Sequence, residues 1–76
     1  MKKIVVYSGN NCGNCKLAKA HLTEKGYEFE EKNVSENVEF RKELMAKGLM
    51  SVPVIDIEGD ILVGFNVAQL DALLNK

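Results

Sequence analysis

The sequence predicts a single α/β domain, residues 1–76, in which a four-stranded mixed sheet is flanked by helices in the order β-α-β-α-β-β-α. Three observations support this fold class: a β-branched run at residues 3–7, apolar residues at helical spacing in three later segments, and a turn at Gly59 between two apolar runs. A strand–helix–strand unit makes its two strands parallel, with a right-handed crossover, whereas a hairpin adds antiparallel strands. The result is a mixed sheet with helices on both faces.

The first strand and helix are predicted from the N-terminal third of the chain. Residues 3–7 are almost continuously apolar, which is typical of a central strand that is buried on both faces. Turn-forming residues follow at positions 8–11. Residues 16–25 show helical spacing, and Gly26 stands just past them as a helix stop. The side of this helix that we expect to pack consists of Leu17, Ala18, His21 and Leu22.

The second strand and helix follow directly. Residues 27–34 begin with strict alternation and are mostly polar on one side, so we expect a strand near the sheet edge. Ser35 is a candidate N-cap, with Glu36 and Glu39 in the first turn, where the helix dipole favours acidic side chains. This helix ends at Gly48, and its expected core positions are Phe40, Leu44 and Met45.

A hairpin and a final helix complete the chain. Residues 49–57 form an apolar run, Gly59 lies in a tight turn between two acidic residues, and residues 61–63 pair back as the last strand. Asn66, with Gln69 three residues later, resembles a capping box. The expected core positions of this part of the chain are Met50, Val67, Leu70, Leu73 and Leu74.

The only two cysteines, Cys12 and Cys15, stand just before the first helical segment. Two sulfurs at this spacing at a helix start can face each other, and they can then close a disulfide or bind a metal. A loop this short constrains the unfolded chain very little, so the pair is a poor structural staple. We therefore expect the pair to have a chemical function.

Redox chemistry gives the two cysteines different roles. A reactive cysteine must be a thiolate at neutral pH, and the N-terminus of a helix lowers thiol pKa values. We expect Cys12, at the helix start, to attack a substrate disulfide. Cys15 lies inside the first turn and should be more buried, so it would attack the mixed disulfide and release the reduced substrate. Because the spacing is short, this second step is intramolecular.

Three neighbours are expected to modulate the pair or its substrate. Gly13 occupies the first helical position and reduces rigidity there. Asn14 can offer hydrogen bonds to a substrate, and Lys16, one turn further on, can add a positive field.

Pro53 is the second notable feature. A proline next to Val52 inside a predicted strand is unusual, because it has no N–H to contribute to the sheet. Its position is explained if the Val52–Pro53 peptide bond is cis and lies at a functional bend. The backbone of Val52 would then be free to pair with an extended substrate segment beside Cys12.

These features together resemble the glutaredoxin branch of the thioredoxin superfamily. The similarity extends over the whole chain, and the segments that support it are the strand at residues 4–7, Cys12-Gly13-Asn14-Cys15, Ser51-Val52-Pro53 and Gly64-Phe65. The resemblance implies the thioredoxin fold and a cis Pro53. It also implies that Cys12 is the exposed nucleophile, that Cys15 is the resolving thiol, and that the two form a redox-active disulfide.

Three positions differ from glutaredoxins that use glutathione. Those proteins carry a lysine where this chain has Gly9, a Gly-Gly turn where it has Gly64-Phe65, and an acidic residue where it has Asn66-Val67-Ala68. The Gly-Phe turn is similar to that of NrdH-redoxins, which are reduced by thioredoxin reductase with electrons from NADPH and pass them to ribonucleotide reductase. The Arg-Pro-Asp-like stretch that usually follows in NrdH-redoxins is not matched at residues 66–68.

The resemblance thus implies a thiol–disulfide oxidoreductase that reduces protein disulfides, without a bound cofactor or metal, and that is recycled by thioredoxin reductase. A glutathione-dependent glutaredoxin is the first alternative. The second is an iron–sulfur cluster or zinc ion held across a dimer, because one chain offers only two thiols and His21, whereas a complete site needs four ligands.

Two aromatic side chains have open assignments. Phe65 either packs in the core or forms a wall of the substrate groove beside Cys12. Tyr7, at the end of the central strand, is either a core residue or a substrate contact. His21 is expected to pack near the sheet as a residue of the helix face.

The composition of the chain argues against nucleic acid and membranes as partners. A formal net charge of -1 and a pI of about 5.8 do not attract nucleic acid or an anionic membrane. No apolar stretch approaches the roughly 20 residues that a membrane span needs. Cytosolic thiols are kept reduced, and a C-x-x-C pair in the cytosol is usually catalytic or metal-binding, so we expect a cytoplasmic protein. We also expect a monomer.

Overall fold

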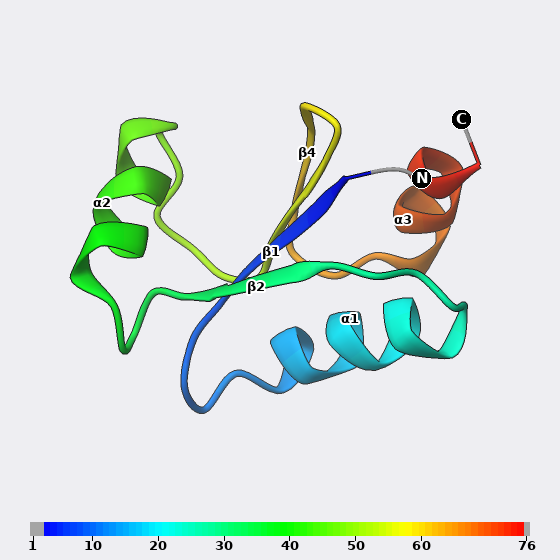
Figure 1. Ribbon diagram of the computed structural model, residues 1–76, viewed down its shortest axis with the longest axis horizontal. Coiled ribbons are helices and arrows are strands. Elements are labelled where there is room, and N and C mark those ends of the chain that lie inside the picture. Colours follow the sequence, from blue (N-terminus) through cyan, green and yellow to red (C-terminus); the bar gives the residue numbers. More distant parts are fainter. Residues whose placement is uncertain (1–2, 76) are drawn as a thin grey trace.

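The computed structural model describes residues 3–75, which form one four-stranded sheet and three helices (Figure 1). In chain order the elements are β1 (Ile4–Ser8), α1 (Gly13–Glu24), β2 (Glu30–Asn33), α2 (Val38–Ala46), β3 (Val54–Ile57), β4 (Asp60–Val63) and α3 (Val67–Leu74). This is the predicted order. None of the helices within residues 3–75 is long and apolar enough to cross a membrane.

The sheet has the strand order β2-β1-β3-β4. β1 is parallel to β2, with Val6 opposite Glu31, and antiparallel to β3, with Val6 opposite Ile55. β4 pairs with β3 as a hairpin across a turn that contains Gly59. The prediction of a buried central first strand is therefore confirmed, as is the position of the second strand at an edge.

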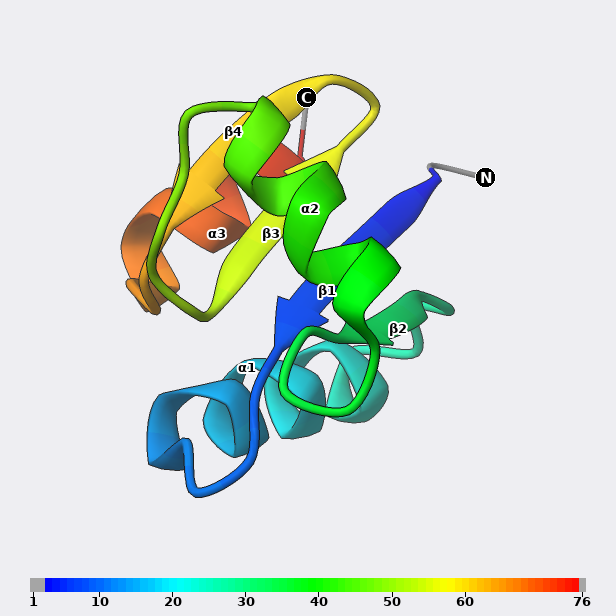
Figure 2. The same ribbon diagram turned by 90° about the vertical axis from the view of Figure 1, so that its left-hand side faces the viewer.

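The three helices cover opposite faces of the sheet (Figure 2). α1 and α3 pack on one face, over a core of nine buried apolar residues: Ile4, Val6, Ala18, Leu22, Ile55, Ile57, Leu62, Leu70 and Leu74. α2 packs alone on the other face, over the smaller cluster of Val5, Tyr7, Leu44 and Val54. Alternate residues of β1 thus serve both cores, since successive side chains of a strand point to opposite faces.

Polar contacts add to the attachment of α2. The Tyr7 hydroxyl donates to Glu43 Oε1 at 2.9 Å, and Lys32 Nζ donates to the same oxygen at 2.7 Å. The lysine also lies over the Tyr7 ring, 5.7 Å from its centroid. Burial and the neighbouring Glu43 carboxylate raise the pKa of Tyr7 to about 12. Tyr7 is only 2% exposed, which supports its assignment as a core residue. Its role as a substrate contact stays a prediction.

The boundaries of the second strand and helix differ from the prediction. β2 is limited to Glu30–Asn33, and α2 begins two residues later than expected. Asn37, not Ser35, is the N-cap, because its side chain accepts from the amides of Glu39 (2.9 Å) and Phe40 (3.4 Å). The Ser35 hydroxyl accepts a different hydrogen bond, from the Asn10 amide.

Several residues predicted for the core are exposed. Met45 is 52% exposed, because the nine-residue α2 buries Leu44 against the sheet and leaves this neighbour outside. Met50, in the segment after α2, is 87% exposed. Leu17 and Val67 are also exposed. The spacing of apolar residues identifies which side of a short helix packs against the sheet. It does not determine how many residues on that side become buried.

Candidate active site

Cys12 is the N-cap of α1, and it forms a disulfide with Cys15. Its backbone is extended (φ -110, ψ 103), and the Cα atoms of the two cysteines are 5.2 Å apart. The Cys15 amide donates to Cys12 Sγ at 3.1 Å. Cys12 is partly exposed, whereas Cys15 is only 1% exposed. The predicted difference in burial between the two cysteines is therefore confirmed.

The start of α1 is suited to a negatively charged sulfur. The first amides of a helix have no partner within the helix and stabilise an anion placed at its N-terminus. Cys12 Sγ already accepts one of these amides, so the same group can stabilise the thiolate once the disulfide is reduced. Gly13, Asn14 and Lys16 are all exposed around the pair, and a Cβ added at Gly13 would meet no atom within 4 Å.

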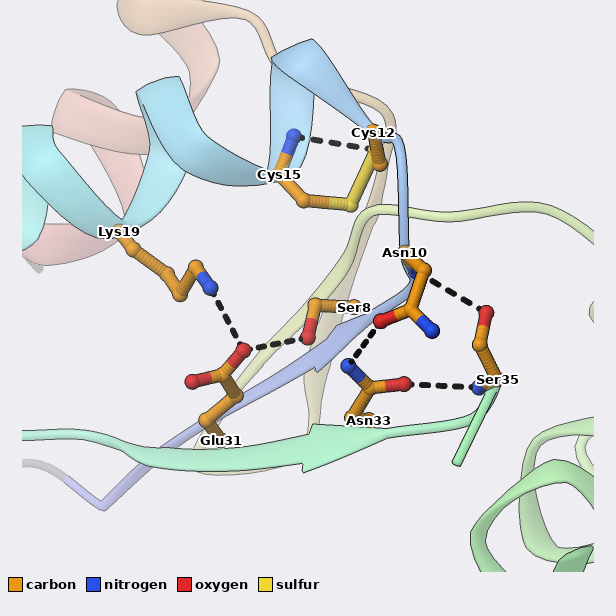
Figure 3. Close-up of a disulfide and its surroundings, with 8 residues drawn as sticks. All are labelled: Ser8, Asn10, Cys12, Cys15, Lys19, Glu31, Asn33 and Ser35. Atoms are coloured by element: carbon orange, nitrogen blue, oxygen red, sulfur yellow. Dashed lines mark hydrogen bonds and ion pairs between the residues drawn. A yellow bond between two sulfur atoms is a disulfide. The ribbon is translucent and has the colours of Figure 1, made fainter. Parts of the chain in front are cut away.

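A hydrogen-bonded group below the cysteines joins three elements (Figure 3). The fully buried Ser8 hydroxyl donates to Glu31 Oε2 at 2.7 Å, and Lys19 Nζ contacts the same oxygen at 2.6 Å. The lysine first, and then the serine, lower the pKa of Glu31 from its usual 4.5. This group fastens α1 to the two strands beneath it.

The loop before Cys12 is held by contacts that the sequence did not predict (Figure 3). Asn10 contacts both Asn33 and Ser35, at the junction between β2 and α2. Asn11 then adopts a left-handed conformation (φ 57) directly before Cys12. The turn-forming composition of both segments was visible in the sequence, but their pairing was not, because 23 positions separate Asn10 from Asn33.

The Val52–Pro53 peptide bond is cis, as predicted. The Pro53 carbonyl accepts from the Gly64 amide at 2.8 Å, so the Val52-Pro53 turn and the Gly64-Phe65 turn lie side by side. Gly64 has φ 85, a conformation that favours glycine. A Cβ built on Gly9 would lie 3.3 Å from Val52 Cγ2, which places Val52 against the loop that leads to Cys12.

Phe65 and His21 contact each other beneath this second turn. Phe65 is partly buried and packs against the core of α1 and α3. Its ring meets that of His21 edge-on, with centroids 6.1 Å apart. His21 Nε2 lies 2.8 Å from Asp71 Oδ1, so it connects α1 to α3. The prediction that His21 packs as a helix-face residue is confirmed.

An apolar groove of about 140 Å³ adjoins Val52 on the α2 side. It lies between α2 and the segment before Pro53, and its lining consists of Val34, Arg41, Leu44, Met45, Leu49, Met50 and Val52. Within residues 3–75, no group of three or more His, Cys, Asp or Glu side chains is placed to hold a metal ion. The hypothesis of a metal shared between two chains stays a prediction.

The family model for glutaredoxin matches residues 4–62. The chain belongs to the glutaredoxin family. Its members with similar sequences include a glutaredoxin-like 8.6 kDa protein of the rubredoxin operon of Clostridium pasteurianum, 40% identical over 74 residues, which cover 96% of this chain and 99% of that protein. The glutaredoxin-like protein NrdH of Lactococcus lactis is 36% identical over 70 residues, or 92% of this chain and 97% of the relative.

The solved structure of the glutaredoxin-like protein NrdH-redoxin from Escherichia coli is also similar. It superimposes with a TM-score of 0.84 at 28% identity, covering 93% of each chain. The glutaredoxin and thioredoxin-fold assignments made from the sequence are therefore confirmed. A family member with a Cys12–Cys15 disulfide at a helix N-terminus is a thiol–disulfide oxidoreductase.

Proposed function

We propose that this protein is a dithiol electron carrier that reduces protein disulfides and is itself reduced by thioredoxin reductase. The observation that carries the proposal is the near full-length similarity to NrdH proteins, one of which is described as having a thioredoxin-like activity profile. The first turn of α3 supports it, because this turn contains no acidic residue that could hold the amino group of glutathione. Asn66, at the start of that turn, uses its side-chain oxygen to cap the helix.

The surroundings of Gly9 also favour a partner other than glutathione. A Cβ at this position would lie 3.0 Å from Ser35 Oγ and 3.3 Å from Val52 Cγ2. A lysine, which glutathione-using relatives carry here, would require these neighbours to move. Ser35 and Val52 therefore occupy space that a side chain at position 9 would need.

The reaction proceeds in two exchanges. The Cys12 thiolate attacks one sulfur of the substrate disulfide, that S–S bond breaks, and the departing substrate sulfur takes up a proton. Cys15, after losing its proton, attacks Cys12 Sγ, and the second substrate sulfur leaves as a thiol. Two electrons and two protons reach the substrate, and the Cys12–Cys15 disulfide forms. The partial exposure of Cys12 and the burial of Cys15 support this order.

The substrate is an extended polypeptide segment that lies beside Cys12. We assign Val52 as the backbone contact of this segment, next to Pro53, and Gly64, Phe65 and Asn14 as further contacts. Strand-like pairing gives affinity without requiring one sequence. The apolar groove next to Val52 offers space for a substrate side chain. Ribonucleotide reductase and other cytoplasmic proteins with reducible disulfides are the proposed acceptors.

The electron donor is tested by supplying two reducing systems in parallel. Turnover of a protein disulfide is measured with NADPH and thioredoxin reductase, and separately with glutathione and glutathione reductase. We expect robust turnover with the first system and little with the second. Robust turnover only with glutathione would overturn the choice of donor and leave the thiol–disulfide chemistry in place.

The division of labour between the cysteines is tested by single substitutions. Cys12→Ser should abolish turnover, because the attacking sulfur is lost. Cys15→Ser should accumulate a mixed disulfide with the substrate, visible by mass spectrometry, because the resolving step is lost. Undiminished turnover of protein disulfides by Cys15→Ser would contradict the dithiol mechanism.

A further inference from the structure

We propose that Asn33 and Ser35 are positioning residues for the active site, which hold Cys12 at the N-terminus of α1 and thereby set its reactivity. They lie at the junction of β2 and α2, outside the cysteine motif and the Pro53 turn. The proposal rests on the thiol–disulfide chemistry of Cys12. It does not depend on which reductase supplies the electrons.

Asn33 links the junction to the loop before Cys12 (Figure 3). Its Oδ1 accepts from the amides of Ser35 (2.8 Å) and Glu36 (3.1 Å), which closes the turn after β2. Its Nδ2 points the other way and donates to Asn10 Oδ1 at 3.1 Å. One side chain therefore both shapes its own turn and contacts the cysteine loop.

Ser35 provides the second link. Its Oγ accepts from the Asn10 amide at 3.0 Å, so Asn10 is held through both its backbone and its side chain. The same Oγ lies 3.0 Å from the position of a Cβ on Gly9. Because Gly9 has no side chain, Ser35 approaches the loop closely enough to make this hydrogen bond. Val52 also packs against Gly9, so this contact region joins the loop before Cys12 to the turn at Pro53.

The held residue is only two positions before the nucleophile. Asn11 is left-handed, and Cys12 then takes the extended conformation of an N-cap. The hydrogen bond from the Cys15 amide to Cys12 Sγ depends on this placement. If Asn10 were released, the Cys12 backbone would sample other positions, and its thiolate would lose part of the stabilisation that the helix provides.

A turn-forming role alone does not explain these contacts. The turn after β2 uses only Asn33 Oδ1, and the start of α2 is capped by Asn37. The two cross-links to Asn10 are additional to both. Each can be removed without changing the hydrogen bonds of the turn or of the helix cap, so their contribution can be measured separately.

The experiment measures the rate at which iodoacetamide alkylates Cys12 in the reduced protein, as a function of pH. Asn10→Ala removes the acceptor of Asn33, and Ser35→Ala removes the acceptor of the Asn10 amide. We expect each variant to lower the rate at neutral pH by about 3- to 10-fold, the effect of losing a hydrogen bond, and to move the midpoint of the profile to higher pH. The double variant should be slower than either.

Two further variants separate positioning from stability. Asn37→Ala destabilises α2 by removing its cap but leaves both cross-links, so its alkylation profile should match that of the unmodified protein. Ser35→Thr retains a hydroxyl and should restore most of the rate. Circular dichroism tests whether each variant is folded. If one of Asn10→Ala and Ser35→Ala does not fold, the comparison rests on the other.

The proposal is overturned if Asn10→Ala and Ser35→Ala keep the alkylation profile of the unmodified protein. It is also overturned if Asn37→Ala slows alkylation as much as they do, since the effect would then follow stability. Alkylation needs neither a reductase nor a protein substrate. A failure of the proposed electron donor therefore leaves this measurement unchanged, and the two hypotheses can fail independently.

Discussion

The two faces of the sheet are covered in different ways. The face under α1 and α3 holds a core of nine buried apolar residues and bears the helix with the cysteine pair. The face under α2 holds four buried residues, and a polar group made by Tyr7, Lys32 and Glu43 adds to their packing. The exposed Met45 and Met50 and an apolar groove lie on the α2 side of the sheet.

This difference suits the two faces to different roles: the α1 and α3 face supports the nucleophile, and the α2 face has exposed apolar surface. A helix that must hold Cys12 Sγ near the Cys15 amide benefits from a closely packed base, because packed interiors resist displacement. A face with fewer buried residues can leave apolar surface outside for another protein, and methionine adapts to surfaces of different shape. Four predictions test the contrast, in decreasing order of expected effect.

The largest effect is expected from shortening one leucine on each face. Leu22→Ala should lower the free energy of unfolding by about 4 kcal/mol and Leu44→Ala by about 2 kcal/mol. Leu22 is 0% exposed within the larger core, whereas Leu44 lines the open groove, where a cavity would be accessible to water. Urea unfolding of the oxidised protein measures both, with the exposed Leu17→Ala as control. Equal losses of unfolding free energy for Leu22→Ala and Leu44→Ala would show that the two faces of the sheet do not differ in this way.

The next prediction concerns the hydroxyl of Tyr7. Tyr7→Phe removes its hydrogen bond to Glu43 and should lower the free energy of unfolding by about 1 kcal/mol. Tyr27→Phe, on the opposite face, is the matched control. Because the pKa of Tyr7 in the folded protein is raised from 10.0 to about 12, the unfolded state loses this proton first.

It follows that stability should fall as the pH rises from about 10 to about 12. This slope should be shallower in Tyr7→Phe. Ultraviolet titration of the folded protein should show a tyrosine step near pH 12 that the same substitution removes. A tyrosine step at 12 that persists in Tyr7→Phe would contradict the assignment.

A smaller effect is expected from the two paired carboxylates. The pKa of Glu31 is lowered first by Lys19, and that of Glu43 first by Lys32, each from the usual 4.5. A lowered pKa in the folded state means that the stabilisation is present above the ordinary glutamate pKa and is lost as the pH falls through and below it.

Glu31→Gln and Glu43→Gln should therefore each flatten the acid limb of stability below pH 4.5. Urea unfolding at a series of pH values measures the slope, and the double variant should be flattest. Slopes that match those of the unmodified protein would show that these pairs add nothing measurable, which is common for exposed pairs.

The smallest effect is expected for the methionines beside the groove. Met45→Gln and Met50→Gln should change the free energy of unfolding by less than about 0.5 kcal/mol, because both side chains are exposed. The same variants, assayed for reduction of a protein disulfide, report whether this surface contacts a substrate. A loss of several kcal/mol would restore the sequence-based prediction that these residues belong to the core.

Local patterns predicted most of the fold. The β-branched residues of β1, the Gly26 and Gly48 helix stops and the turn at Gly59 each act over a few residues, and all were placed correctly. The start of α2 was misplaced because Ser35 and Asn37 are both good caps, and the choice between them depends on a contact of Ser35 with Asn10, 25 positions away. The burial of Tyr7 could not be predicted from the sequence, because the end of a strand does not reveal whether a helix covers it.

The sequence by itself determined the chemistry: two cysteines three apart at the start of a helix, followed by Val52-Pro53 and Gly64-Phe65. These signals are local, because capping, turns and short-range sulfur pairing depend on neighbouring residues. Only the tertiary structure decided what surrounds Cys12. It placed Gly9 against Ser35 and Val52, and Asn10 against Asn33. Contacts between segments so far apart in the chain arise from the packing of the whole sheet and its helices, which no single stretch of sequence specifies.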